Sequence, residues 1–134
     1  MIRFMLDTNI CVDVLRRNDR IILGHFDNCQ AGEIAISSIV LAELQHGIFK
    51  GNRQSEDREV MIDFCSPLEI LPFDELAAST YGRIRSSLER AGTPIGPLDT
   101  LIAAHAMSHD CTLVTNNENE FRRVDGLPVE NWTV

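Results

Sequence analysis

Three acidic residues occupy positions that a folded chain would bring together. Asp7 follows directly after the apolar run 2–6, Glu43 lies at the edge of an apolar helical stripe, and Asp99 lies in the first turn of an apolar helix that begins near Pro97. Carboxylate oxygens are the ligands that Mg²⁺ prefers in proteins. A cation held in this way activates water and neutralises a phosphodiester during hydrolysis. The three acids therefore predict metal-dependent cleavage of a nucleic acid.

Each acid taken alone has a simpler explanation. Asp7 suits the N-cap of the helix that follows it, and Glu43 can be an ordinary solvated helix residue. Asp99 can act only on the helix dipole, which is worth about 0.3–1 kcal/mol. The metal-binding interpretation is favoured because all three acids can reach one edge of one sheet. Carboxylates so close together repel one another, so we expect the protein to gain stability when it binds Mg²⁺ or Mn²⁺.

Short apolar runs alternate with amphipathic segments along the whole chain. Strands are expected at residues 2–6, 33–37, 70–71, 111–115 and 129–132. Helices are expected at residues 10–17, 20–30, 38–48, 53–64, 74–90, 98–109 and 119–123. The alternation predicts a single α/β domain over residues 1–134, in which a central, mostly parallel sheet of about five strands is flanked by helices on both faces. The loops at the carboxyl ends of such strands form the functional site.

Local signals predict several details of the helices. Ser37 or Ser38 is expected to cap helix 38–48 and Gly47 to weaken its end. Asp74 is expected to cap helix 74–90. In helix 53–64, the expected inner face consists of Val60, Met61 and Phe64.

The composition limits the class of protein. The hydrophobic content of 44% is normal for a soluble domain, and no apolar run approaches the roughly 18 residues of a membrane span. The four cysteines lack metal-site spacing and are expected to be reduced thiols of a cytoplasmic protein. A net charge of −8 argues against a general nucleic-acid binder. A nuclease with this charge needs either a metal-filled acidic site or a basic partner.

Four segments of the sequence resemble the motifs of a known family. They are FMLDTNI at 4–10, SSIVLAEL at 37–44 followed by Gly47, GPLDTLIAAHA at 96–106, and LVTNN at 113–117 followed by Glu120 and Phe121. In this order they resemble the motifs of PIN-domain toxins of the VapC family. The resemblance spans nearly the entire chain, and the four motifs together are highly specific.

The resemblance implies a PIN-like three-layer α/β/α fold and an RNA-cutting toxin of a type II toxin–antitoxin pair. It implies that Asp7, Glu43 and Asp99 hold Mg²⁺, with Mn²⁺ also supporting activity. It further implies a homodimer, a cognate VapB-type antitoxin whose tail enters the active-site groove, and a higher hetero-oligomer that meets DNA only through the antitoxin. The local details are most similar to enterobacterial members that cut initiator tRNA in the anticodon loop.

The sequence departs from the family pattern after the last motif's threonine. Many PIN domains carry a fourth acid there, whereas this chain has Asn116 and Asn117, and Glu120 is the nearest acid. A second metal would therefore be held weakly or not at all. In this interpretation Asn117 orients water and Glu120 acts through a bridging water.

Four further polar residues are expected to support the acids. Thr8 and Asn9 are expected to hydrogen-bond around Asp7, and Thr115 to support a carboxylate or bind phosphate. Ser38 is a candidate for a supporting contact, with helix capping as its simpler role.

Other functions stay open at this point. A PIN-fold nuclease acting on other RNA or on DNA, such as a flap-type DNA nuclease, would use the same acids, and a non-enzymatic binding module would retain only the fold. His105 and His109 are four residues apart on one helix and resemble a zinc pair, but no third ligand has matching spacing. His105 is therefore expected at the edge of the core.

Overall fold

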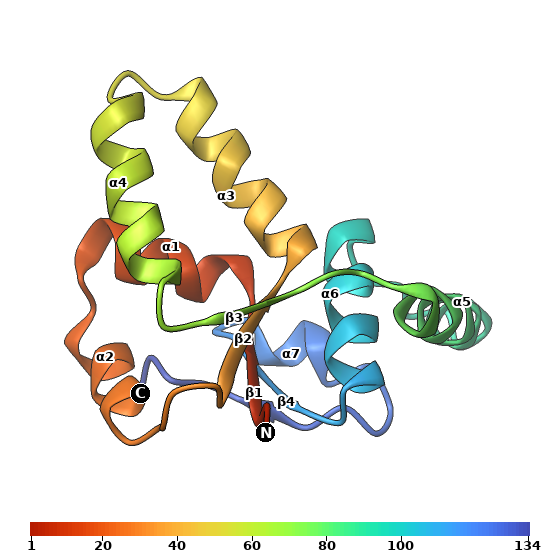
Figure 1. Cartoon of the computed structure of the whole chain (residues 1–134). Helices are drawn as coiled ribbons and strands as arrows, with labels where there is room; N and C mark the ends of the chain where they lie inside the picture. Colours follow the sequence, from red (N-terminus) through yellow and green to blue (C-terminus); the bar gives the residue numbers. More distant parts are fainter.

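The computed structural model describes residues 1–134 and contains one five-stranded sheet (Figure 1). The strands are β1 (Phe4–Leu6), β2 (Ile34–Ser37), β3 (Glu69–Leu71), β4 (Thr112–Val114) and β5 (Val129–Glu130). They lie in the order β3-β2-β1-β4-β5, and every neighbouring pair is parallel. The expected parallel sheet of about five strands is confirmed.

Seven helices surround this sheet. They are α1 (Thr8–Arg17), α2 (Arg20–Asp27), α3 (Ser38–Lys50), α4 (Gln54–Cys65), α5 (Glu75–Arg90), α6 (Pro97–Ser108) and α7 (Glu118–Phe121). Figure 1 shows α1 and α2 on one side of the sheet and α5 and α6 on the other. The predicted three-layer α/β/α architecture is therefore confirmed. None of the helices has both the length and the apolar content that crossing a bilayer requires.

The strand order creates a topological switch point between β1 and β4. From β1 the chain builds outward through β2 and β3, whereas β4 and β5 lie on the other side of β1. Leu6 at the end of β1 is in register with Val114 at the end of β4. In open parallel sheets, the helices that follow the two central strands diverge at such a point and leave a crevice at the carboxyl edge. Asp7 and Thr115 are the first residues beyond these two strands.

The helix ends follow the local signals of the sequence. Asp7, Ser37 and Asp74 cap α1, α3 and α5, and each side chain accepts a backbone hydrogen bond at 3.0 Å. Pro97 begins α6, where its missing N–H removes no helical bond. Ser38 is not the cap, because the Ser37 hydroxyl already accepts the Ile39 N–H.

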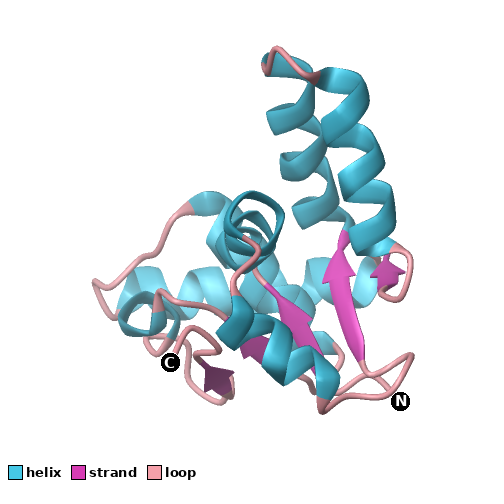
Figure 2. Ribbon diagram, turned by 90° about the vertical axis from the view of Figure 1, so that its left-hand side faces the viewer, coloured by secondary structure: helices cyan, strands magenta, loops and turns pink.

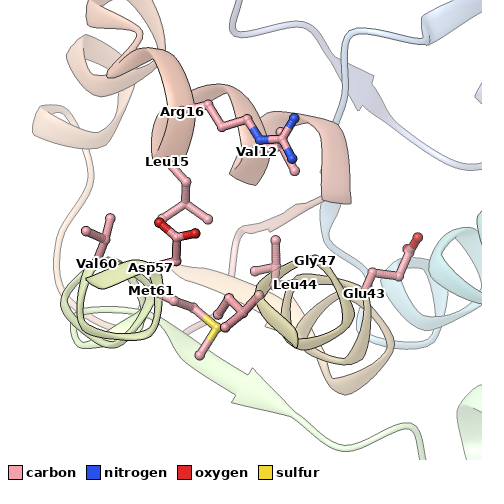
Figure 3. A pocket seen from close by; sticks show the side chains of 10 residues that line it. Val12, Leu15, Arg16, Glu43, Leu44, Gly47, Asp57, Val60 and Met61 are labelled. Carbon is pink, nitrogen blue, oxygen red and sulfur yellow. The ribbon is translucent and has the colours of Figure 1, made fainter. Parts of the chain in front are cut away.

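Helices α3 and α4 form a hairpin that projects away from the sheet (Figure 2). A groove of about 350 Å³ runs between this hairpin and α1. Its apolar lining comes from all three helices, and Arg16, Glu43 and Asp57 add charge (Figure 3). The apolar members are Val12, Leu15, Leu44, Ile48, Val60 and Met61.

One expectation about this hairpin was wrong. Val60 does not belong to a buried inner face, because 48% of its surface is exposed, whereas Met61 and Cys65 are buried. The cause is that Val60 lines the open groove. Gly47 lies in the last turn of α3, which continues to Lys50, so the roughly 1 kcal/mol helical cost of glycine does not end the helix there.

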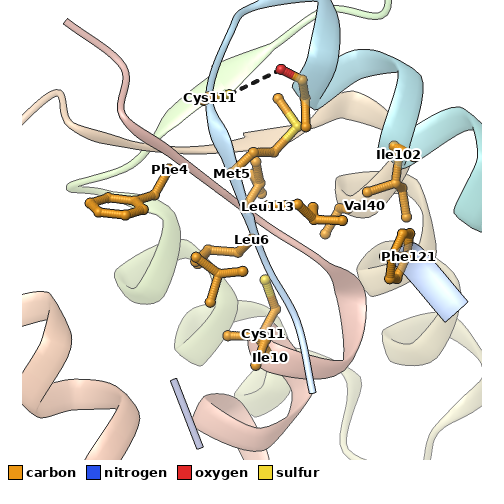
Figure 4. Packing of buried hydrophobic residues seen from close by; sticks show 14 of the residues in the cluster. Phe4, Met5, Leu6, Ile10, Cys11, Val40, Ile102, Cys111, Leu113 and Phe121 are labelled. Carbon is orange, nitrogen blue, oxygen red and sulfur yellow. Dashed lines mark hydrogen bonds between the residues drawn. The ribbon is translucent and has the colours of Figure 1, made fainter. Parts of the chain in front are cut away.

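The core fills both faces of β1 and β4. Met5, Leu6 and Leu113 are completely buried between side chains of the surrounding helices (Figure 4). Burying a side chain of this size stabilises the fold by about 1.5–3 kcal/mol. Because both central strands are buried on two faces, they read as continuous apolar runs rather than alternating ones. The core therefore fixes the ends of β1 and β4, where the polar residues begin.

The aromatic side chains and cysteines are mostly structural. Trp132 is only 2% exposed and stacks on His25 with 5.0 Å between ring centroids, so its ring is part of the core. Phe49 lies outside the core, with 58% of its surface exposed. All four cysteines are free thiols, and Cys11, Cys65 and Cys111 are buried. The hydrogen bond from the Cys111 thiol to the Ala106 carbonyl is drawn in Figure 4.

Candidate active site

Asp7 is the most constrained acid of the site. Its Oδ1 accepts the Ile10 N–H at 3.0 Å, and its Oδ2 accepts the hydroxyl of Thr115. Only 3% of Asp7 is exposed, and this burial raises the pKa of its carboxyl to about 6, although the hydrogen bonds from Thr115, Ile10 and Asn9 act to lower it. Asp7 is therefore an N-cap, as its simpler explanation proposed, and also a carboxylate with both oxygens fixed at the switch point.

Glu43 reaches the same edge from the second turn of α3. Its Oε1 accepts the hydroxyl of Thr8 at 2.6 Å, so the residue after Asp7 holds the carboxylate of a different helix. Thr8 was expected to hydrogen-bond around Asp7, and for its side chain this expectation was wrong. The Thr8 side chain is carried by the first turn of α1, which turns it toward α3 and away from the Asp7 carboxyl.

The carboxylates of Asp99 and Glu120 meet beside Gly96. The Gly96 N–H donates to Glu120 Oε1 at 2.9 Å. A Cβ on Gly96 would lie 3.6 Å from Asp99 Oδ2 and 3.7 Å from Glu120 Oε1. The first turn of α6 and the short helix α7 therefore bring these two acids together, although they are 21 positions apart in the sequence.

The pKa of Asp99 shows that the acids influence one another. Burial raises it first, the neighbouring Glu120 raises it further, and the charges of Asp7 and Glu43 add to the effect, so that the pKa reaches about 7. A carboxyl group with this pKa is only partly ionised at neutral pH. The charges of the four acids thus act on one another across the site.

The donor set of this site fits a hard divalent cation. Every candidate ligand is a carboxylate oxygen, and no thiolate or imidazole is among them. Burial is the first cause of the raised pKa of both Asp7 and Asp99, and the charge of Glu120 is the second cause for Asp99. No three His, Cys, Asp or Glu side chains converge into a ready-made cluster. Each acid is instead tied to its own donor, namely Thr115, Thr8 or the Gly96 N–H.

The residues predicted to support the acids differ in the partners that they contact. Thr115 supports a carboxylate, as expected, and its oxygen also accepts the Asn117 N–H at 2.9 Å. The Asn117 amide donates to Glu120 Oε2, which places both residues at the site. Asn116 turns away and donates to Asp13 at 3.3 Å. It is an exposed contact outside the acidic group.

Asn9 and Ser38 lie beside the site rather than in it. Asn9 contributes its backbone N–H to the Asp7 carboxylate, while its side chain is exposed. The Ser38 hydroxyl accepts the Phe73 N–H at 3.1 Å and so anchors the segment before α5. The role of Gly96 was not predicted, because a hydrogen bond from a backbone N–H does not depend on the type of residue. The glycine directly before Pro97 was the only available signal.

A parallel α/β sheet with an acidic group at its switch point is the layout of a PIN domain, and the profile described as "PIN domain" matches residues 4–127. The "tRNA(fMet)-specific endonuclease VapC" of Shigella flexneri is 41% identical over 133 residues, covering 99% of this chain and 100% of that protein. "Ribonuclease VapC2" of Rickettsia felis is 42% identical over 133 residues, covering 96% and 97%. This chain belongs to the VapC family of PIN domains.

Solved structures of VapC complexes have the same fold. The structure of VapBC2 from Rickettsia felis bound to a DNA fragment from its promoter gives a TM-score of 0.93 at 42% identity, covering 98% of this chain and 99% of that one. The structure of DNA-bound VapBC from Salmonella typhimurium gives a TM-score of 0.94 at 41% identity, with the same coverage.

Proposed function

We propose that this protein is the toxin of a type II toxin–antitoxin pair and a Mg²⁺-dependent endoribonuclease that cuts initiator tRNA in its anticodon loop to inhibit translation. The observation that carries the proposal is the coupled group of Asp7, Glu43 and Asp99 at the switch point, with the pKa of Asp99 raised to about 7 by burial and by neighbouring acids. The names of the relatives support the reaction class and, for two of them, the tRNA substrate.

In this proposal Asp7, Glu43 and Asp99 hold Mg²⁺ or Mn²⁺. The bound cation supplies water activation and neutralises the charge of the scissile phosphate. The side chains around the acids keep the ligands in place: Thr115 fixes Asp7 and Thr8 fixes Glu43. Such outer contacts tune metal sites because they set the orientation and basicity of the ligands.

In this proposal Asn117 and Glu120 position the water that attacks the phosphodiester. Glu120 is held on both oxygens, by the Gly96 N–H and by the Asn117 amide, and it couples to Asp99. A carboxylate in this position can orient water and accept its proton. It takes the place of the fourth acid that asparagines 116 and 117 do not supply.

The experiment is cleavage of an initiator tRNA transcript by the purified protein with Mg²⁺, read at nucleotide resolution. Asp7→Asn and Asp99→Asn are expected to lower the rate by at least about 100-fold, because each removes a ligand charge. Asp27→Asn, an exposed acid at the end of α2, is the matched control and should cut at the wild-type rate. Equal rates in wild type and Asp7→Asn would refute the proposal.

The choice of substrate is tested in the same assay. Elongator tRNAs, a structured messenger RNA and a DNA copy of the anticodon stem-loop serve as competing substrates. Cleavage of all RNAs at similar rates would support a ribonuclease without tRNA preference, in agreement with relatives that are named only "Ribonuclease VapC2". Preferential cleavage of the DNA copy would favour a DNA nuclease on this fold.

The proposed partner is a VapB-type antitoxin that occupies the groove between α1 and the α3–α4 hairpin (Figure 3). The groove offers an apolar floor, and Glu43 of the candidate site is one of its lining residues. A chain bound there would reach the active site and compete with RNA. The net charge of −8 favours a partner segment that carries basic side chains.

The remaining expectations about assembly and location form part of the same proposal. The toxin acts in the cytoplasm, pairs as a homodimer, and joins a larger complex with antitoxin that reaches promoter DNA through the antitoxin. In a growth assay, induced expression should arrest a bacterial culture, and co-expression of the neighbouring small open reading frame should restore growth. Arrest by Asp7→Asn to the same extent would contradict the enzymatic basis of the toxicity.

A further inference from the structure

His105 is a buried polar residue that the proposed chemistry does not use. It lies in α6, none of its surface is exposed, and its Nδ1 is 2.7 Å from the Ser37 Oγ. Its Nε2 is buried without a hydrogen-bond partner. A buried polar atom without a partner destabilises the fold, so we looked for a function that would account for His105 at this position.

Ser37 pairs with both α3 and α6. Its oxygen accepts the Ile39 N–H at 3.0 Å as the cap of α3, and its hydroxyl also forms the hydrogen bond with His105 Nδ1, whose direction depends on the tautomer of the ring. Burial and then the neighbouring His109 lower the pKa of His105, whereas Asp74 and the backbone of Pro72 raise it.

A second contact closes the arrangement into a network. Ser38 accepts the Phe73 N–H at 3.1 Å, and the Phe73 ring packs edge-on against the His105 ring at 5.4 Å between centroids. The two adjacent serines at the start of α3 therefore hold α6 on one side and the segment between β3 and α5 on the other. We name Ser37, Ser38, Phe73 and His105 the α3–α6 network.

The network joins the two helices that carry opposite sides of the candidate site. Glu43 is six residues beyond Ser37 on α3, and His105 is six residues beyond Asp99 on α6. A shift between the helices at Ser37 and His105 would therefore change the separation of Glu43 and Asp99. A directional hydrogen bond resists such a shift better than an apolar contact, which tolerates sliding.

We infer that His105 is a positioning residue: through its hydrogen bond with Ser37 it sets the separation of Glu43 and Asp99 for cation binding. This inference rests on the proposed function. It assigns His105 neither to proton transfer nor to zinc. Its ring contacts Ser37, Phe73 and His109 rather than any of the acids, and no three-residue metal cluster includes it.

The experiment measures Mn²⁺ binding to the full-length protein by the electron paramagnetic resonance signal of free Mn²⁺, together with melting temperature and RNA cleavage. His105→Leu removes the hydrogen bond at similar volume and is expected to weaken Mn²⁺ binding about tenfold, the lower end of the effect of outer-shell substitutions. His105→Asn places an amide near the position of Nδ1 and is expected to recover most of the affinity. Leu88→Ala, a buried residue of α5 outside the network, is the control for lost stability.

A double-mutant comparison isolates the hydrogen bond itself. Ser37→Ala should weaken Mn²⁺ binding as His105→Leu does, and the double variant should be no weaker than either single variant, because one interaction is lost in all three. Wild-type Mn²⁺ affinity in folded His105→Leu, or an equal loss of affinity in Leu88→Ala, would overturn the inference. If the wild type binds Mn²⁺ but cuts no RNA, the proposed function fails while the Mn²⁺ data still decide the role of His105.

Discussion

The Thr115 hydroxyl donates a hydrogen bond to Oδ2 of Asp7 across a separation of 108 residues. The two residues are the first beyond β4 and β1, the strands on either side of the switch point. The same threonine oxygen accepts the Asn117 N–H at 2.9 Å, so one hydroxyl links the first acid to the loop that carries Asn117 and Glu120. Both motifs are thereby locked into one site before any cation binds.

Replacing Thr115 tests this link. Thr115→Val keeps the volume but leaves Asp7 Oδ2 without its donor, so the pKa of Asp7 should rise further and the carboxylate should lose its orientation. We expect cleavage and Mn²⁺ affinity to fall about 10–100-fold. Thr115→Ser keeps the hydroxyl and should stay within a few-fold of wild type. Equal activity in the Val and Ser variants would show that the hydroxyl does not orient Asp7.

Replacing Asp99 by a neutral residue should inactivate the enzyme but stabilise its fold. Asp99 has a pKa raised to about 7, first by burial and then by Glu120, so its ionised form is disfavoured in the folded state. Asp99→Asn should therefore raise the free energy of unfolding by about 1–2 kcal/mol at pH 8 without divalent cations, after allowance for solvent screening of this half-buried group. Melting temperature in EDTA is the measurement, with an expected rise of roughly 3–8 °C. A lower melting temperature for Asp99→Asn would show that the carboxylate is stabilising.

The raised pKa values of Asp7 and Asp99 also predict how the stability of the fold changes with pH. The pKa values of Asp7 and Asp99 are about 6 and about 7 in the folded protein and near 3.8 when unfolded. Between about pH 4 and pH 7 the folded state therefore binds more protons, and these groups make the protein less stable as the pH rises. In EDTA, the melting-temperature difference between Asp99→Asn and wild type should be smaller at pH 5 than at pH 8, because the effect builds up from about pH 4 to about pH 7.

Saturating Mn²⁺ should reverse this trend for the wild type. Cation binding requires ionised carboxylates, so the affinity and the stabilisation it provides increase with pH. A wild-type melting temperature that is unchanged by Mn²⁺ at pH 8 would contradict a metal site at these acids.

The sequence predicts well what depends on local chemistry. The apolar runs that become β1 and β4 and the N-caps at Asp7, Ser37 and Asp74 each follow from a few adjacent residues. The position of Asp7 at the carboxyl edge was also predictable, because it directly follows β1, whereas the positions of Glu43 and Asp99 depend on how α3 and α6 pack.

Long-range contacts were not predictable from the sequence. Nothing in the sequence distinguishes Ser37, which caps α3, from Ser38, which holds the Phe73 N–H, until the position of α6 decides which hydroxyl faces His105. The partner of Thr8 depends in the same way on where α3 crosses α1. Val60 was assigned to the core because helical periodicity shows which residues share a face but not whether anything covers that face.

Val60 gives the sharpest test of the proposed antitoxin groove. Its side chain lines the groove but is already 48% exposed, so Val60→Asp should change the free energy of unfolding by less than about 1 kcal/mol. The buried charge that it would create under a bound apolar segment should weaken antitoxin binding by at least about 100-fold, measured by calorimetry with the purified antitoxin. Ile62→Asp is the matched control, since Ile62 lies on the same helix, is 56% exposed and does not line the groove.

RNA cleavage by free Val60→Asp should match wild type, and antitoxin should no longer inhibit it. Equal loss of binding in both variants would contradict docking in the groove, because Val60 and Ile62 are two positions apart and lie on opposite faces of α4.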